Sequence, residues 1–448
     1  MPEILSRFSF SSTLSLTALT LIGASAAMWL GVGHPLLLLS IGAVVAGVLC
    51  VARAPWLAIV AIVGVEAFVL PLMAAGIDRG PITLASFALG IIGAFATLIK
   101  GVPQTRIIVW ATVAVTVLLL ANGIMVGLMS LPFEQLLAGI RIFLTPILAG
   151  IIGLGAVDST RYRVLRFATI VIGFSFFAAL YETFIGIDGL ISLGLDYGTN
   201  VRSYYGELRA PGLFATNYSL GAFAGVMGSL AFVWWPSIEI GINAAKWRIV
   251  AIVCGVGCLI LSIYRTGVLV LLVSIVLWTL FGRGKGATAR KSIATVSGIF
   301  VVVYFFQSGL ASTASLIARQ SVWSSVIENH GFAWFGNGLG FAGSSSISRF
   351  SAEEIIVDNY YLNLLLQLGV LAVLLFIPLL VVGAQLTVKS SSISGLQSGY
   401  VLVACGVAFV FVDFWEYTSA MSLALFCVGA ALKVLSSSAV QPSFASAK

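Results

Sequence analysis

The sequence predicts an all-α integral membrane protein, built as a single polytopic bundle of about fourteen (12–14) transmembrane helices. Of its 448 residues, 60% are hydrophobic and 9% are charged, whereas soluble domains carry about 25% charged residues. The mean hydropathy is +1.11. Apolar runs that approach or exceed the roughly 20 residues of a membrane span recur along the whole chain. One membrane domain over residues 1–448 is therefore expected.

Fourteen apolar runs are candidate membrane spans. They are 12–30, 34–51, 56–75, 82–99, 106–126, 136–156, 163–186, 212–234, 247–263, 266–281, 292–308, 359–384, 396–412 and 417–435. All five cysteines lie in such runs without further metal ligands nearby, so packing is their expected role. The first run has no clear small-residue cleavage site and is followed by further spans, so no cleavable signal peptide is predicted.

The basic residues predict the orientation of these spans. With alternating spans, sixteen of the 23 basic residues fall on one side, including all seven lysines. Cytoplasmic loops collect Lys and Arg, so this side is predicted to be cytoplasmic, with both termini on it. The net charge of +7 then reflects topology and does not indicate a nucleic-acid partner.

The run 249–281 carries Arg265 as its one charged residue and has basic residues just beyond both ends. Both ends are therefore predicted to be cytoplasmic, so the run must cross twice and turn near Ser262–Thr266. Its 33 residues give about 50 Å of helix, whereas two crossings need about 60 Å. The turn should be slightly sunken. Arg265 would then either snorkel at a helix end or bind an anion there.

The basic residues predicted on the outer side are all arginines: Arg79, Arg141, Arg202, Arg209, Arg265, Arg319 and Arg349. Arginine presents a planar fork of donors that binds phosphate oxygens in pairs, whereas lysine is a hydrated point charge. An outer face with arginine alone suits a diphosphate held near the membrane surface. The alternative is chance, because arginine outnumbers lysine sixteen to seven in the chain.

Two of these arginines have informative contexts. Arg209 lies immediately before the span at 212, and Arg141 lies inside a span. An ionisable residue within the membrane is a functional candidate, although a salt bridge from Arg141 to Glu134 or Glu182 would also explain it. The others have weaker contexts: Arg79 beside Asp78 suggests a solvated ion pair, and no neighbours distinguish Arg202 and Arg349.

The longest connection, 309–358, is predicted to face outside, and loops of this length are usually functional. Within it, SLIARQSVWSSVIEN predicts an amphipathic helix that either lies on the membrane over the bundle or acts as a passive lid. Arg319 and Trp323 are one turn apart and can stack on each other. The following His330 is expected to be a solvated surface residue.

The segment WFGNGLGFAG contains a formal GxGxxG pattern over residues 338–343. Nucleotide binding is excluded because no strand precedes the pattern and the loop is predicted to face outside. The glycines are instead expected to form a tight loop with backbone amides close to a ligand.

The loop ends in VDNYYLNLLLQLG. Asp358 is either the N-cap of the following helix or a functional carboxylate. Asn359, Asn363 and Gln367 then form a polar stripe at helical spacing. A lipid-facing helix would not carry such a stripe, so this face is expected to look toward partners or a cavity.

Four stretches resemble the O-antigen ligase and polysaccharide polymerase family of bacterial inner membranes, which contains the Wzy-type polymerases and the lipopolysaccharide O-antigen ligases. The stretches are RAPGLFATN, LSIYRTGVLVLL, RQSVW followed by GNGLG, and DNYYLNLLLQLG. The family pattern of Ser-x-x-Arg, Arg-x3-Trp, a glycine-rich turn and an acid or His before a leucine-rich helix falls, in order, on Ser262–Arg265, Arg319–Trp323, Gly336–Gly340 and Asp358–Gly369. The resemblance covers roughly residues 200–370.

This resemblance implies a glycosyltransferase of polysaccharide biosynthesis. It would transfer oligosaccharide from an undecaprenyl-diphosphate donor to an acceptor hydroxyl at the periplasmic face, without ATP, metal or cofactor. Arg265 and Arg319 would hold the diphosphate as leaving group, and Asp358 would orient or deprotonate the acceptor. Substrate-binding candidates are Arg209, Arg141, Asn359, Trp323 and Tyr264. Membrane lipids surround the bundle, and a chain-length regulator is a further candidate partner.

Polymerase, ligase and transporter remain alternative hypotheses. Ligases that act on lipid A-core usually carry His where this chain has Asp358, which favours an exopolysaccharide or O-antigen polymerase. A lipid-linked glycan flippase would be expected to show internal repeats with broken helices at mid-membrane. No convincing repeat is present in the sequence, and the charged residues cluster at the outer ends of the spans.

Overall fold

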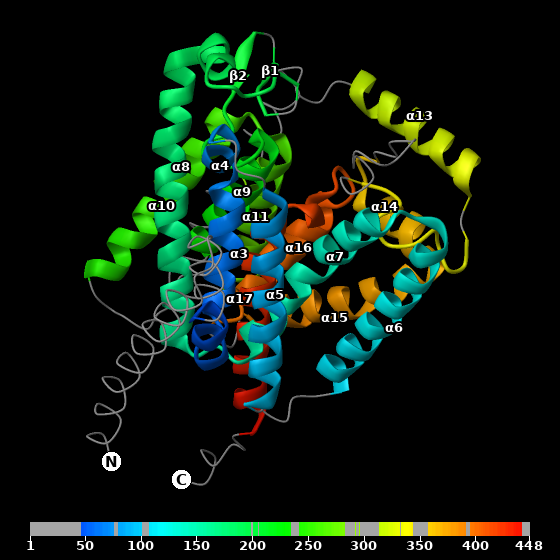
Figure 1. The fold of residues 1–448 in the computed structure, drawn as a ribbon. Coiled ribbons are helices and arrows are strands. Elements are labelled where there is room, and N and C mark those ends of the chain that lie inside the picture. The colour runs from blue at the N-terminus through cyan, green and yellow to red at the C-terminus, as the bar shows by residue number, and fades with distance from the viewer. Residues whose placement is uncertain are drawn as a thin grey trace, which may run out of the picture.

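The computed structural model describes residues 46–75, 79–100, 107–198, 200–204, 206–233, 242–282, 292, 295, 313–331, 333–343, 357–390 and 395–440. It shows an all-α membrane protein, in which the described sheet consists of one two-stranded hairpin (Figure 1). In these residues six helices are long and apolar enough to cross a membrane, or up to seven if one bent pair is counted as a span. A count of fourteen is not confirmed, and the predicted span 12–30 and most of 34–51 and 292–308 lie outside the described residues.

Most predicted spans within the described residues coincide with helices. The helices are α3 (Leu57–Ala67), α4 (Val69–Ala74), α5 (Arg79–Ile99), α6 (Ile107–Ser130), α7 (Phe133–Leu154), α8 (Asp158–Ser192), α9 (Asn217–Val233), α10 (Ile242–Ser262), α11 (Arg265–Phe281), α13 (Thr313–His330), α14 (Tyr360–Leu368), η1 (Gly369–Ala372), α15 (Val373–Lys389), α16 (Ser398–Ala408), η2 (Phe414–Glu416) and α17 (Thr418–Val440). The strands are β1 (Arg202–Tyr204) and β2 (Glu207–Arg209).

Helices α9 and α17 form the centre of the bundle, since most residues of both are buried. Small residues let α9 and α11 approach closely. A Cβ atom on Gly267 would lie 2.2 Å from the carbonyl oxygen of Gly221, and one on Gly225 would lie 2.5 Å from that of Gly267. Glycine at such positions allows backbone packing between helices where lipid gives no hydrophobic driving force.

The predicted single span 359–384 is broken. Helix α14 has nine residues, which gives about 14 Å of helix and is too short to cross the membrane. The chain turns at Gly369, whose φ of 69° favours glycine. The helical segments Tyr360–Ala372 and Ile377–Lys389 meet at 105°. The leucine-rich run is therefore a broken span or a re-entrant segment.

The glycine-rich loop 336–343 packs against α6, α7 and α14. Gly336, Gly338, Gly340 and Gly343 all have positive φ, between 71° and 98°. The backbone amides of residues 337–341 all donate within the protein, to Leu366, Gln367, Gly123 and Gly338. These amides are already paired, so the expectation that they approach a ligand is wrong. The loop is a packing element that holds neighbouring helices together.

Gly139 on α7 provides a test of this packing. A Cβ atom there would lie 2.3 Å from the backbone nitrogen of Gly340. We expect Gly139→Ala to destabilise the protein by about 1–3 kcal/mol because backbone must shift to make room. Thermal unfolding of the detergent-solubilised protein measures this. Gly173→Ala on α8 is the matched control, since a Cβ atom there meets nothing within 4 Å, and equal melting temperatures for both variants would contradict the packing role.

Basic residues predicted to be cytoplasmic cap helix ends at one end of the bundle. Lys100 donates to the carbonyl oxygens of Ala52 and Arg53 at 3.0 and 2.7 Å. The other caps of this kind are Arg248 to Ala231 and Phe232 and Lys433 to Gly155. Cationic side chains stabilise the carbonyl-rich ends of helices. The hairpin and α13 lie at the opposite end, at the top of Figure 1.

Candidate functional site

The hairpin β1–β2 brings two arginines together that the sequence did not connect. Arg202 pairs directly with Arg209 across the two antiparallel strands, and Tyr204 pairs with Glu207. Side chains alternate along a strand, so these four residues share one face. Leu208 on the other face packs into a small apolar cluster with Leu70, Leu190, Leu195 and Val201. The buried leucine therefore fixes which face presents the arginines.

Both hairpin arginines lie over the ring of Tyr218 at the start of α9. The Cζ atoms of Arg202 and Arg209 lie 4.8 and 5.1 Å from its ring centroid. Arg202 also donates from Nη1 to the Tyr218 hydroxyl at 2.9 Å. Each guanidinium is thus held in place by an aromatic face, an arrangement that stabilises a cation.

The turn between α10 and α11 is where the sequence predicts it, and the segment after the hairpin holds it. Ile263 has a φ of 48°, an unusual value for a β-branched residue. The carbonyls of three successive turn residues accept hydrogen bonds: Leu261 from the Ala210 amide at 3.1 Å, Ser262 from Asn217 at 3.1 Å and Ile263 from Arg209 at 3.0 Å. The RAPGLFATN stretch therefore clamps a strained turn.

This turn presents Arg265 to the hairpin. Arg265 is the first residue of α11 and is half-buried. Its Nη2 atom donates to the Tyr204 hydroxyl at 2.7 Å, and its Cζ lies 5.1 Å from the Tyr204 ring centroid. The predicted sunken arginine therefore contacts protein. Three guanidiniums, those of Arg202, Arg209 and Arg265, gather around two tyrosine rings, and we call them the arginine cluster.

Two predicted site residues from the outer loop meet each other. Arg319 on α13 and Asp358 form an ion pair, with Nε and Oδ2 3.6 Å apart and both side chains partly exposed. Asn359 is the N-cap of α14, since its side chain accepts from the Leu362 amide at 3.1 Å. The N-cap is thus Asn359 and not Asp358, and the Asp358 carboxylate faces Arg319.

The predicted amphipathic helix forms as α13 and packs one face against α14. Trp323, Val326 and Ile327 pack against a cluster that includes Leu362 and Leu366 of α14, while Gln320 is exposed. His330 packs edge-on against Phe341, with ring centroids 5.4 Å apart. Helix α13 is therefore docked on α14 and on the glycine-rich loop, which positions Arg319.

Tyr264 links the two groups. Its ring centroid lies 5.5 Å from that of Tyr218 and 5.9 Å from that of Tyr417. Burial raises the pKa of the Tyr264 hydroxyl, and the Asp358 carboxylate adds to this shift. Tyr417 follows Glu416, which accepts a hydrogen bond from Asn363 on α14, the helix that begins two residues after Asp358. A chain of side-chain contacts thus runs from Tyr218, below the arginine cluster, to the helix that follows Asp358.

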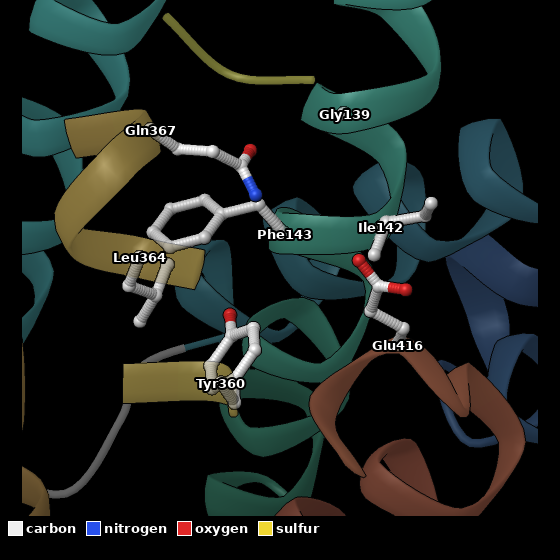
Figure 2. Close-up of a pocket in the computed structure, with 7 residues that line it drawn as sticks. All are labelled: Gly139, Ile142, Phe143, Tyr360, Leu364, Gln367 and Glu416. Atoms are coloured by element: carbon white, nitrogen blue, oxygen red, sulfur yellow. The ribbon is translucent and has the colours of Figure 1, made fainter. Parts of the chain in front are cut away.

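The polar stripe on α14 faces inward, as predicted, and two acids meet it. Gln367 donates to Asn363, and Asn363 donates to Glu416 at 3.2 Å. Figure 2 shows the Gln367 amide and the Glu416 carboxylate projecting into a small pocket that Gly139 and Tyr360 also line. Burial and the charge of Glu416 raise the pKa of Asp413. The stripe is therefore part of a buried polar network.

Asp413 and Glu416 were not among the predicted site residues. A signal was present, since FVDFWEY places two acids within four residues between two apolar runs. Arg202 was likewise not among them, because no neighbours in the sequence distinguish it. A signal was present here too, since Gly206 between RSYY and ELR favours a turn that would pair Arg202 with Arg209.

The remaining predicted residues have other neighbours. Arg141 on α7 donates to the hydroxyl of Thr83 on α5. Glu182, one of its suggested partners, instead accepts from the Gly212 amide at 2.7 Å and so supports the segment after the hairpin. Arg349 lies outside the described residues, as does the side chain of Arg79.

No family model matches this chain, and no curated protein is similar to it. The family resemblance therefore rests on the motifs themselves and on the geometry that joins them. That geometry gathers three guanidiniums at one end of a membrane bundle and links them, through tyrosine contacts, to the helix that follows Asp358. Such an arrangement can hold an anionic group and accept a proton from a neighbouring hydroxyl.

Proposed function

We propose that this chain is a bacterial inner-membrane polysaccharide polymerase. It would transfer oligosaccharide repeat units from an undecaprenyl-diphosphate donor onto an acceptor sugar hydroxyl. The observation that carries the proposal is the arginine cluster, which side-chain contacts through Tyr264 and Tyr417 link to α14, the helix that begins beside Asp358. Guanidiniums bind phosphate oxygens in a fixed fork geometry, so this cluster suits a diphosphate.

The proposal includes the topology. The end of the bundle with the arginine cluster would be periplasmic, and the end with Lys100, Arg161, Arg248 and Lys433 would be cytoplasmic with both termini. This follows the excess of basic residues in cytoplasmic loops. A full complement of about fourteen spans would include the runs outside the described residues.

The arginines would act on the donor diphosphate, and Asp358 would act on the acceptor hydroxyl. The acceptor hydroxyl oxygen attacks the anomeric carbon of the donor sugar, and the bond between that carbon and the diphosphate oxygen breaks. Charge grows on the diphosphate as it leaves, and prepositioned guanidiniums such as those of Arg265 and Arg319 stabilise it. The hydroxyl proton passes to the Asp358 carboxylate, which acts as general base.

The Arg319–Asp358 contact suits this division. A separation of 3.6 Å between a half-exposed pair is a weak interaction. A diphosphate can therefore replace the Asp358 carboxylate as the partner of Arg319 at little cost in free energy. The carboxylate is then available to contact the acceptor. Binding of the donor would then prepare the base for the second substrate.

Purified protein supplied with lipid-diphosphate oligosaccharide, without ATP or divalent metal, tests the function. The expected result is a ladder of products that grows by one repeat unit on a gel. A single added block on a lipid acceptor would instead indicate a ligase. An unchanged donor, in the presence of acceptor and folded protein, would contradict the proposal.

A further inference from the structure

Helices α8 and α10 share an exposed side that extends from the end of the bundle with the basic helix caps. The two helices lie side by side at one edge of the bundle (Figure 1). A Cβ atom on Gly257 of α10 would meet the ring of Phe176 on α8, and the Cys258 thiol donates to the Ile172 carbonyl at 3.8 Å. Both helices are long and apolar enough to cross a membrane, so residues exposed along this side contact lipid.

On this side each helix presents one exposed cation, followed by exposed apolar residues at helical spacing. The cations are Arg166 on α8 and Lys246 on α10. The apolar residues that follow them are Ile170, Phe174 and Phe177 on α8, and Val250, Val253 and Ile260 on α10. Residues three and four apart lie on one face of a helix, so a cation stands at the end of a continuous apolar stripe on each helix.

Trp247 holds the two cations at the same level of the bundle. The Cζ atom of Arg166 lies 4.8 Å from the centroid of the Trp247 ring, and Lys246 is the preceding residue in the chain. Tryptophan is enriched at the boundary between membrane and water, so Trp247 marks the level of the lipid headgroups. A guanidinium has five N–H donors, and its contact with one ring leaves donors for a phosphate at this level.

We propose that the exposed side shared by α8 and α10 binds one anionic phospholipid from the surrounding leaflet. Arg166 and Lys246 hold its phosphate, and its acyl chains lie along the two apolar stripes. The order of the residues matches the ligand, since a phospholipid carries its phosphate at one end and its apolar chains beyond it. Basic sites between transmembrane helices are known to bind anionic lipids in this way.

The alternative is that Arg166 and Lys246 only add to the positive field at this end of the bundle, which orients a membrane protein without a defined lipid site. Arg163 separates the two explanations. It is exposed and lies three residues before Arg166, but it contacts Trp56 beside α3, at 5.8 Å from the ring centroid. A general field depends on Arg163 and Arg166 alike, whereas the proposed site depends on Arg166.

Lipid binding to the purified full-length protein, measured by native mass spectrometry, tests the proposal. The probes are phosphatidylglycerol, phosphatidylcholine with the same acyl chains, and the soluble headgroup glycerol phosphate. Wild type should bind phosphatidylglycerol about tenfold more tightly than phosphatidylcholine, whose phosphate is neutralised by its own cation. Glycerol phosphate should compete poorly because it has no acyl chains. Equal affinity for the two lipids, or competition by glycerol phosphate as strong as that of phosphatidylglycerol, would overturn the proposal.

Three substitutions locate the site. Arg166→Met and Lys246→Met should each weaken phosphatidylglycerol binding by about tenfold and leave phosphatidylcholine binding unchanged. Arg163→Met is the matched control and should stay within about twofold of wild type. Arg166→Lys keeps the charge, guards against a folding defect and should be intermediate. Equal losses in the Arg163 and Arg166 variants, or wild-type binding in both Arg166→Met and Lys246→Met, would overturn the proposal, and neither result depends on glycosyl transfer.

Discussion

Replacement of Arg265 by methionine should lower the rate of glycosyl transfer by about 10²- to 10³-fold. This is the effect of removing one preorganised donor from a site where charge develops in the transition state. Methionine keeps the length and apolar character needed at the start of α11, so the bundle should fold. The measurement is the turnover of lipid-diphosphate oligosaccharide by purified protein, with thermal unfolding as the check on folding.

Arg265→Lys and Arg163→Met complete this experiment. Lysine retains the charge but cannot form the forked contact with phosphate oxygens, so Arg265→Lys should be intermediate. Arg163 lies at the other end of the bundle, so the Arg163→Met protein should turn over substrate like wild type. A folded Arg265→Met protein with wild-type turnover would remove the arginine cluster from the mechanism.

Replacement of Asp358 by asparagine should lower turnover by about 10²- to 10⁴-fold, the usual contribution of a general base. Its effect on stability should stay within about 1 kcal/mol, because the ion pair with Arg319 is partly exposed. Asn359 remains the cap of α14 in this variant. Turnover and thermal unfolding, measured on the same preparation, separate the two effects.

Asp358→His distinguishes a base from a structural residue. An imidazole can accept the proton, so this variant should retain more activity than Asp358→Asn. Its rate should acquire a new pH dependence and fall below about pH 6.5 as the imidazole becomes protonated. If Asp358→Asn were as active as wild type, Asp358 would have no catalytic role.

The strongest predictions from the sequence were those that follow from the constraints of the lipid bilayer. The basic residues on both sides of the run 249–281 required a turn near Ser262–Thr266, and α10 ends at Ser262 while α11 begins at Arg265. Likewise, a polar stripe on a leucine-rich helix had to face inward, and Asn363 and Gln367 do so. Hydrocarbon tolerates few exceptions, so such patterns are reliable.

Other features depend on contacts that periodicity does not encode. Arg202 and Arg209 are seven positions apart and pair because the chain turns at Gly206, whereas the pattern of membrane spans puts both in a loop. The bend at Gly369 depends on a positive φ and on the loop carbonyls of Ala333 and Trp334 beside it. Neither is visible as hydrophobicity.

The glycine-rich loop was also predicted from the sequence only in part. Its sequence correctly predicted tight turns, because positive φ favours glycine. The hydrogen-bond acceptors of its amides could not be predicted, since those on α6 and α14 are more than 200 and about 30 residues away in the chain. Backbone amides that suit a ligand also suit a neighbouring helix end.

The most direct test of the arginine cluster is a structure with a bound, non-transferable undecaprenyl-diphosphate sugar. The measurement is the position of the two phosphorus atoms relative to the guanidiniums. We predict that oxygens of the two phosphates lie within hydrogen-bonding distance of Arg202, Arg209 and Arg265, with the sugar toward Asp358. A diphosphate bound at the end with Lys100 and Lys433, or away from all three arginines, would contradict the account.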